Sequence, residues 1–218
     1  LNMIVVEKEE RIKIGKLPVR FFGVTHTIPD SMGVIVETPY GAVVTPGDFK
    51  LDLDQVDGVP TPEEEATYSL FDREKILLLM SDSTNVENPG FSPPEREVHR
   101  NLENIIKNIK GRLFIGTFAS QLERMIKIIG FAEKYGRKIV IEGRSMKTNV
   151  EVAMLAGLLE VKKGSVISVQ DISNYPDDKV VILATGAQGE EFAALMRIAN
   201  KTHKQLRFKK GDTVILSS

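Results

Sequence analysis

RLFIGTFASQLERMIKIIGFAEKYGRKIVIEG, residues 112–143, is the stretch that decides the fold class of this chain. Its first six residues predict a strand, QLERMIKIIGFAEKYG predicts a helix that ends at Gly136, and KIVIEG predicts a second strand. The alternation continues downstream, where MKTNVEVAMLAGLLE and GEEFAALMRIAN predict helices and VVILAT and GDTVILSS predict strands. Strands that alternate with helices indicate a parallel sheet with crossover helices, so we expect an α/β fold.

The residues before about position 88 follow a different pattern. VRFFGV predicts a strand, and GVIVETPYGAVVTP predicts a hairpin that turns around Pro39 and Gly41. KILLLMSDS is a continuous apolar run that ends in polar residues, which predicts a buried strand. We therefore expect a β-rich part over residues 1–87 and a doubly wound α/β part over residues 88–218.

The composition limits the classes of function. The chain has 218 residues, of which 42% are hydrophobic, and a formal net charge of −1, so charge alone is not expected to hold it to nucleic acid. It has no cysteine, which excludes a disulfide scaffold and a thiolate metal site and fits the reducing cytoplasm, the location we expect. No apolar run approaches the roughly 18 residues of a membrane span, so we expect no membrane partner.

Three of the predicted strands end in small, polar loops that open helices: GTFAS (116–120), GRSMKTN (143–149) and TGAQGEE (185–191). Free backbone N–H groups at helix N-termini suit phosphate. The candidate phosphate-binding residues in these loops are Thr117, Ser120, Arg144, Ser145, Gly186, Gln188 and Gly189. The alternative is that the hydroxyl residues only cap helices. None of the loops matches a Walker loop or GxGxxG, which disfavours an ATPase or a dinucleotide enzyme.

The three histidines have different surroundings. His99 lies in a predicted helix among charged residues and is interpreted as a surface group. His203 lies in HKQLRFKK, which is interpreted as a solvated loop, with a nucleic-acid contact as the alternative. His26 lies in GVTHTIPDS, and Asp48 and Asp82 both follow predicted strands. An imidazole with carboxylates nearby is a candidate metal site, although two ligands alone do not complete one.

An ordered set of motifs carries a resemblance to a known family: THTIPDSMG, TPGDFKLD, SDSTNVENPGFSPPER, GTFASQLERM, GRSM, TGAQGE and RIANKTHKQ. From about residue 17 to its end, the chain resembles ribonuclease J, of the β-CASP branch of the metallo-β-lactamase superfamily. The resemblance implies part of a metallo-β-lactamase αββα sandwich, over residues 1–87. It implies a β-CASP domain with a mainly parallel sheet flanked by helices over residues 88–218, expected to be incomplete at its C-terminus.

The resemblance also implies a function and roles for single residues. Family members cleave RNA endonucleolytically and degrade it from 5′ to 3′ in a channel between the two domains, using a pair of divalent metals. His26 matches a metal-ligand motif, Asp48 matches the carboxylate that bridges the metals, and Asp82 matches the acidic residue that supports the metal centre. The resemblance implies two Zn²⁺, with Mn²⁺ or Mg²⁺ as alternatives, RNA as the partner, and a dimer or tetramer of the complete protein. The three loops would line the RNA channel.

Two motifs of the family are absent from this sequence, namely HxHxDH and the late HxSGH. We therefore expect an internal segment that binds metal weakly and is inactive alone. A non-catalytic RNA- or nucleotide-binding protein on the same scaffold stays open as an alternative. A hydrolase of small molecules is a third reading, which the β-CASP-like half disfavours because such an enzyme needs no second domain to hold a polymer.

Overall fold

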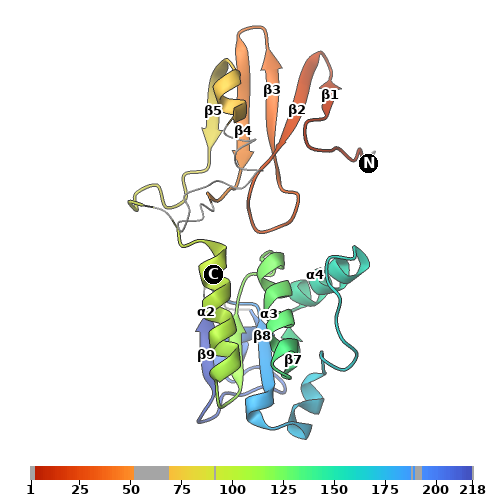
Figure 1. Ribbon diagram of the computed structural model, residues 1–218, viewed down its shortest axis with the longest axis vertical. Helices are drawn as coiled ribbons and strands as arrows, with labels where there is room; N and C mark the ends of the chain where they lie inside the picture. Colours follow the sequence, from red (N-terminus) through yellow and green to blue (C-terminus); the bar gives the residue numbers. More distant parts are fainter. Residues whose placement is uncertain (1–2, 52–68, 91, 188, 190–192, 218) are drawn as a thin grey trace. The chain divides into compact units, whose positions relative to one another are not determined.

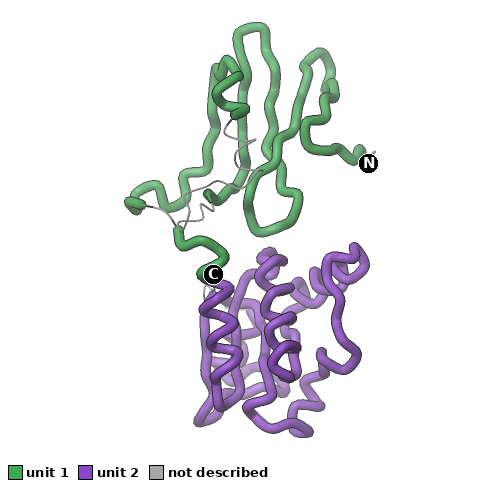
Figure 2. The backbone as a smooth tube through the Cα atoms, in the orientation of Figure 1, with its two compact units in different colours: residues 1–97 green, residues 98–218 purple. Residues whose placement is uncertain are grey.

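The computed structural model describes residues 3–51, 69–90, 92–187, 189 and 193–217. The chain forms two compact units, residues 1–97 and 98–218, drawn in different colours in Figure 2. The change of sequence pattern predicted a boundary at residue 87, ten residues earlier. The helix α2 (Glu95–Asn108) crosses the boundary between the units, and its Leu102 and Ile106 belong to the core of the second unit.

The first unit is built on a five-stranded sheet with the order β1-β2-β3-β4-β5. Its strands are β1 (Arg11–Ile14), β2 (Leu17–Gly23), β3 (Met32–Thr38), β4 (Gly41–Gly47) and β5 (Ile76–Ser81). The predicted hairpin is the β3–β4 pair, in which Thr38 is opposite Gly41. Neighbouring strands are antiparallel from β1 to β4, whereas β5 runs parallel to β4. Consequently β2, β4 and β5 all end at the same edge of this sheet.

The strand predicted from KILLLMSDS is present as β5, but the prediction that it is buried is wrong. Residues 77–80 are 47–57% exposed, although all four are apolar. A continuous apolar run is typical of a strand covered on both faces. Here β5 lies at the edge of the sheet, and the buried apolar strand residues of this unit include Val19, Phe22, Ile35, Ala42 and Val44, all on other strands.

The second unit is a parallel four-stranded sheet with the order β7-β8-β6-β9, as the alternation of strands and helices predicts. The strands are β6 (Leu113–Gly116), β7 (Lys138–Glu142), β8 (Val180–Ala184) and β9 (Thr213–Leu216). The other helices are α3 (Leu122–Lys134), α4 (Arg144–Leu155), α5 (Ala194–Ala199) and the 3₁₀ turns η1 (Val169–Asn174) and η2 (Asp177–Lys179).

Both faces of this parallel sheet are covered. On one face, apolar residues of α2, α3 and α4 pack against alternate residues of the strands, and Figure 1 shows α2 and α3 in front of the sheet. On the other face, α5 and Leu206 pack against Phe114 and Ile182. Every residue of the central strands β6 and β8 is therefore buried. In the described part of the chain, no helix reaches the length and apolarity that crossing a bilayer requires.

A buried ion pair joins the beginnings of β6 and β9. The guanidinium of Arg112 donates two hydrogen bonds to the carboxylate of Asp212, at 2.9 and 2.6 Å, and a third to the carbonyl of Arg207 at 2.9 Å. The side chains of Arg112 and Asp212 are only 9% and 4% exposed. Since the two residues are 100 positions apart, the pair ties the last strand to the first strand of this sheet.

Candidate metal and phosphate sites

Three candidate residues of the first unit lie at one edge of its sheet. His26 follows β2, Asp48 follows β4 and Asp82 follows β5, and these three strands run in the same direction. The hairpin and the parallel strand β5 therefore bring to one edge three side chains that are 22 and 34 positions apart along the chain. This is the edge where the sequence predicts the metal site.

His26 and Asp48 are close in space. The imidazole Nε2 of His26 lies 4.0 Å from Oδ2 of Asp48. Because β3 separates β2 from β4, the ends of these two strands are about 9.5 Å apart, so the loops must bend toward each other. A backbone hydrogen bond of 2.7 Å from Lys50 N–H to the carbonyl of Thr25 holds the two loops together next to these side chains.

Asp82 is electrostatically linked to the same group. The backbone N–H of Thr84 donates a 2.8 Å hydrogen bond to Oδ1 of Asp82, and this bond is the largest cause that lowers the pKa of Asp82 below its usual value. The side chain of Thr84 and the nearby charge of His26 lower the pKa of Asp82 further. The carboxylate is therefore ionised over the neutral range, and its field reaches the imidazole.

The donor types at this edge fit a divalent metal. Two ligands on one tetrahedral ion, with bonds of about 2.0–2.2 Å, lie about 3.4 Å apart, so the 4.0 Å between His26 and Asp48 needs only a small side-chain movement. Their side chains are 34% and 80% exposed, which leaves room for other ligands. Among the described residues, however, no group of three or more such side chains could hold an ion. The pair is thus a candidate for two of the ligands of a metal site.

The candidate phosphate-binding loops of the second unit also share an edge, because all four strands are parallel. Short backbone hydrogen bonds join the residue after one strand to the end of its neighbour: Thr117 N–H to Ala184 O at 3.1 Å, Thr185 N–H to Glu142 O at 3.2 Å, and Ser217 N–H to Gly116 O at 2.8 Å. The starts of the three loops are therefore adjacent, in the order of β7, β8 and β6.

Thr117 is the most unusual polar residue of these loops. It is fully buried, and within the described part of the chain its hydroxyl has no hydrogen-bond partner. A buried hydroxyl without a partner costs about 1–3 kcal/mol, so such groups are rare in folded proteins. The candidates Ser120, Arg144 and Ser145 are by contrast exposed.

Helix capping does not account for the hydroxyl residues. The N-cap of α3 is Gln121 and the N-cap of α4 is Gly143, and neither makes a side-chain capping hydrogen bond. The backbone N–H groups of the first three residues of α4, beginning at Arg144, have no partner within the helix, whereas the N–H of Lys147 donates to the carbonyl of Gly143 at 3.0 Å. Ser145 is one of these three residues.

Two glycines let adjacent loops approach each other closely. Gly143 has φ +116°, and a Cβ there would lie 2.7 Å from the side chain of Thr185. Gly186 has φ +115°, and a Cβ there would lie 2.8 Å from Ala193. Gly189 donates its N–H to the carbonyl of Gly186, at 3.3 Å, in a turn with open space around it. The remaining candidate, Gln188, lies outside the described residues.

His203 is a polar residue that the sequence analysis misjudged. Most of the run is an exposed loop as predicted, but His203 itself is only 7% exposed. Its Nδ1 accepts a backbone hydrogen bond from Leu206 at 3.0 Å, and its Nε2 lies 3.5 Å from the carboxylate of Glu142. Glu142, itself 8% exposed, also accepts a 3.2 Å hydrogen bond from Lys147. The apolar Leu206 was the only signal that this basic run turns inward.

Comparisons with known proteins show which family the chain belongs to. Residues 110–218, half of the chain, match the family profile described as "Ribonuclease J, beta-CASP domain". The chain belongs to the ribonuclease J family. Over its whole length it is 41% identical to the ribonuclease J of Thermus thermophilus and 39% identical to that of Mycoplasma genitalium, and it spans 38% of the length of each.

A solved structure shares the fold. The crystal structure of a protein of unknown function from Enterococcus faecalis superposes on 84% of this chain and 44% of its own chain, with a TM-score of 0.59 and 19% sequence identity. The family profile and this superposition agree with the mixed α/β architecture and the parallel sheet flanked by helices. The predicted fold class of this ribonuclease J family member is therefore confirmed.

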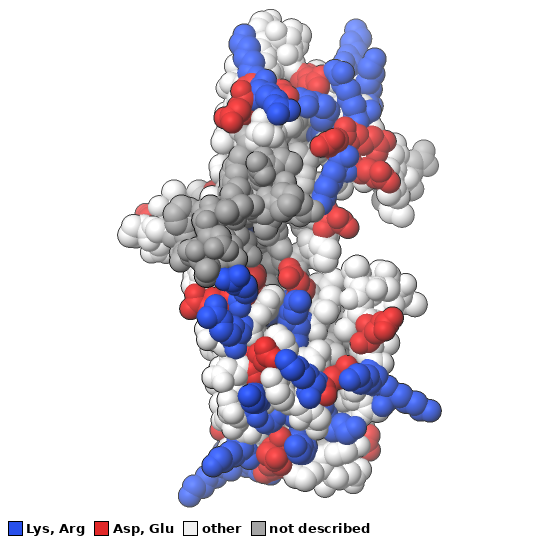
Figure 3. Space-filling view, viewed as in Figure 1, with Lys and Arg blue, Asp and Glu red and all other residues white. Residues whose placement is uncertain are grey.

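The charge distribution limits how a family member could bind an anionic polymer. Figure 3 shows Lys and Arg side chains interspersed with Asp and Glu side chains on the visible face of both units. On this face, no broad basic surface is drawn among the described residues. This face therefore offers a phosphate chain no long-range attraction from a surface of one charge.

Proposed function

We propose that this chain is part of a metal-dependent ribonuclease that hydrolyses RNA phosphodiesters, both endonucleolytically and from the 5′ end. The observation that carries the proposal is the 4.0 Å distance between His26 and Asp48 at the edge where three strands end, in a member of the ribonuclease J family. Imidazole and carboxylate are both ligand types that divalent metals accept, and this distance would let the two side chains share one ion. The 41% identity to a named ribonuclease J over the whole chain supports the same assignment.

In this proposal the three candidate residues at the sheet edge of the first unit have defined roles. His26 and Asp48 would hold divalent metal, Asp48 would be the ligand shared by two ions, and Asp82 would support the centre through its charge. The metals, when bound, lower the pKa of a water molecule so that it can attack phosphorus near neutral pH. The chain's own residues hold the ligands: Thr84 fixes the carboxylate of Asp82 by its 2.8 Å hydrogen bond, and the bond from Lys50 fixes the loop of His26.

The loops of the second unit are the proposed phosphate contacts. Thr117, Ser120, Arg144 and Ser145 would hydrogen-bond phosphate oxygens, and Gly186 and Gly189 would let the backbone approach. This role is supported by the exposure of Ser120, Arg144 and Ser145 and by the helix N-termini that lack side-chain caps. The hydroxyl of Thr117 is buried, so its contact with phosphate requires the loop to move. Gln188 keeps the same proposed role.

The finer assignments extend the same proposal. Residues 1–87 would be the metallo-β-lactamase part and residues 88–218 the β-CASP domain, with RNA as the partner. The metals would be two Zn²⁺, because imidazole and carboxylate ligands suit zinc, although Mn²⁺ accepts the same ligands. A dimer or tetramer and a cytoplasmic location stay predictions.

A chimeric enzyme tests the proposal. This chain would replace the aligned 218-residue segment of the Thermus thermophilus ribonuclease J, and cleavage of a labelled oligoribonucleotide would be followed with and without divalent metal. We expect metal-dependent cleavage that Asp48→Asn abolishes. The matched control is Asp30→Asn, the same change at a side chain that is 87% exposed in the loop of His26.

The outcomes separate the functions under consideration. A folded chimera that cleaves no RNA, or that keeps full activity as Asp48→Asn, would refute the proposal. A folded chimera that binds RNA but cleaves none would favour the non-catalytic binding protein. Far-ultraviolet circular dichroism of each variant establishes folding independently of activity.

A further inference from the structure

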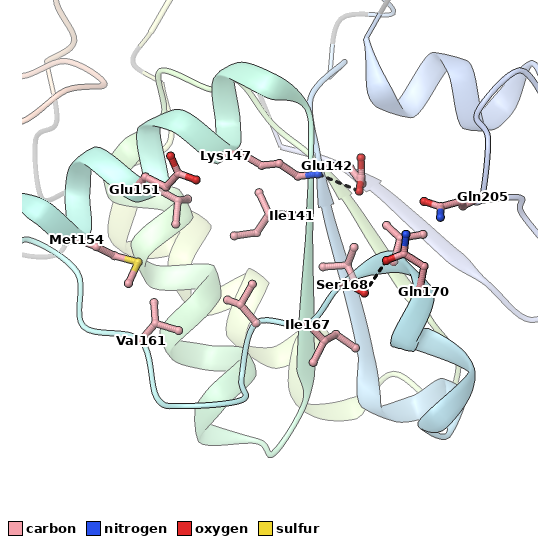
Figure 4. Close-up of a pocket in the computed structure, with 14 residues that line it drawn as sticks. Ile141, Glu142, Lys147, Glu151, Met154, Val161, Ile167, Ser168, Gln170 and Gln205 are labelled. Carbon is pink, nitrogen blue, oxygen red and sulfur yellow. Dashed lines mark hydrogen bonds and ion pairs between the residues drawn. The ribbon is translucent and has the colours of Figure 1, made fainter.

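The second unit contains a cavity of about 490 Å³ at the open edge of β7, away from the residues assigned above. Its walls come from α4 on one side and from the 161–170 segment on the other, as Figure 4 shows. The volume lies in the range of small-molecule sites, which run from about 300 to 1,000 Å³. All of its lining residues belong to the described part of the chain.

The backbone of Ile141 faces this cavity. In a parallel strand, successive residues direct their N–H and C=O groups to opposite sides. Glu142 bonds toward β8, because its carbonyl accepts the N–H of Thr185, whereas Ile139 bonds toward the edge, where both of its groups pair with the 165–167 segment at 2.9 Å. Ile141 is two residues after Ile139, so its N–H and C=O also point to the edge. There the structure records no described residue that pairs with them.

The side chains around this free backbone pair are of two kinds. Val150, Met154, Val161 and Ile167 form apolar walls. Gln170 and Gln205 bring two amides, which can both donate and accept hydrogen bonds, while the hydroxyl of Ser168 already lies 2.9 Å from Oε1 of Gln170. Charge is confined to one end, where Glu142 and Lys147 pair at 3.2 Å, and to the exposed Glu151.

We propose that this cavity binds a nucleobase. The N–H and C=O of one extended residue lie side by side, and they match a ligand edge that has an acceptor next to a donor. Every nucleobase carries such an edge on its Watson–Crick side, and its flat faces suit apolar walls. Phosphate does not fit this cavity, because two of its three charged side chains are carboxylates.

A strand-adding peptide fits less well than a base. The 165–167 segment already occupies the edge of β7 beside Ile139, and β7 ends at Glu142, one residue after Ile141. The free edge therefore offers a single residue pair, whereas strand addition gains its affinity from a row of main-chain hydrogen bonds. A compact ligand with one adjacent donor and acceptor can pair with both free backbone groups of Ile141 and needs no further strand residues.

The base could belong to a free nucleoside or to an RNA chain, and the second source rests on the proposed ribonuclease function. Titration with each of the four ribonucleosides, followed by ¹⁵N–¹H spectra of the 218-residue chain, tests the site itself. We expect at least one nucleoside to shift the amide of Ile141 at millimolar concentration. No shift of this amide with any of the four would overturn the inference.

A pair of variants on one helix provides the matched control. Met154→Trp fills the cavity and should weaken nucleoside binding by about tenfold or more, a loss equivalent to about 1.4 kcal/mol. Val152→Trp adds the same side chain two residues away, at a position that is 54% exposed and does not line the cavity, and should leave the affinity within about twofold. Equal affinity in the two variants would overturn the inference.

An oligoribonucleotide arm distinguishes the sources of the base. If the oligoribonucleotide displaces the nucleoside and shifts the amide of Ile141, RNA supplies the base; if it does neither, the ligand is a free nucleoside or nucleotide. Both outcomes keep the cavity as a nucleobase site. Because nucleosides carry no phosphate and the assay involves no cleavage, failure of the ribonuclease proposal would not change the nucleoside result.

Discussion

The hydroxyl of Thr117 provides a sharp test of whether a polar group is kept for function rather than for folding. It is fully buried at the end of β6, and the described residues offer it no partner. Replacement by valine keeps the branched shape and removes the unpaired oxygen. We expect Thr117→Val to raise the free energy of unfolding of the second unit by about 1–3 kcal/mol, the cost of an unsatisfied buried hydroxyl.

Thr117→Ser is the matched control, because it keeps the hydroxyl and removes one buried methyl group. It should lower the free energy of unfolding by about 1 kcal/mol. Thr117→Val should thus be more stable than Thr117→Ser. If the hydroxyl contacts phosphate, Thr117→Val should nevertheless bind phosphate less tightly than Thr117→Ser, since a hydrogen bond to a charged group contributes about 1.5–3 kcal/mol. Thr117→Val should then bind a 5′-phosphorylated oligoribonucleotide about tenfold or more weakly, and Thr117→Ser should bind it almost as the unchanged chain does.

Hydrogen exchange of the amides in β6 and β8 is the appropriate stability assay, because it measures opening of the second unit separately from the first. Calorimetric titration with the oligoribonucleotide measures binding. A Thr117→Val chain that is less stable than the unchanged chain would mean that the hydroxyl has a partner after all. If Thr117→Val is more stable and binds the oligoribonucleotide with unchanged affinity, the hydroxyl only destabilises the fold and Thr117 has no role in phosphate binding.

Three other predictions follow from the described contacts. Asp212→Ala should lower the free energy of unfolding by about 3–5 kcal/mol in urea denaturation, because it leaves the buried guanidinium of Arg112 uncompensated. The hydrogen bond from Lys134 lowers the pKa of Glu103, so this pair stabilises the fold above the usual pKa of glutamate and loses its effect as the pH falls; Glu103→Gln should show a smaller loss of stability on acidification. Zinc titration by calorimetry should detect weak binding that His26→Ala removes, because the pair has lost its imidazole ligand.

The strands and the longer helices of the second unit could be predicted from the sequence because each carries its own local pattern, whereas the 3₁₀ turns η1 and η2 were not predicted. RLFIGT, KIVIEG and VVILAT lie in β6, β7 and β8, and the helix before Gly136 ends within two residues of the expected position. The order of the strands could not be predicted in the same way. β6 comes first along the chain but lies between β8 and β9, and pairing between segments 100 residues apart leaves no local pattern.

Burial was harder to predict than secondary structure. Residues 77–80 are apolar and exposed, and His203 lies in a basic run and is buried. Both errors have one cause. The sequence shows only the type of a side chain and its neighbours along the chain, whereas burial depends on segments that are distant in sequence. The environment of His203 is set by Glu142, which approaches from another strand end, and by the turn in which Leu206 donates to Nδ1.

Both candidate sites lie at a sheet edge where strands of the same direction end. The two units differ in how much buried core lies beneath that edge. In the second unit, buried clusters cover both faces of the sheet, and the loop starts are joined by backbone hydrogen bonds. In the first unit, the described hydrophobic cluster contains four buried residues, and His26 and Asp48 lie on exposed loops. Rigid support favours fixed contacts with phosphate oxygens, whereas a pair of ligands on exposed loops gains its order only when further ligands and an ion are present. Weak metal binding by this chain is therefore compatible with a strong metal centre in a protein that supplies the remaining ligands.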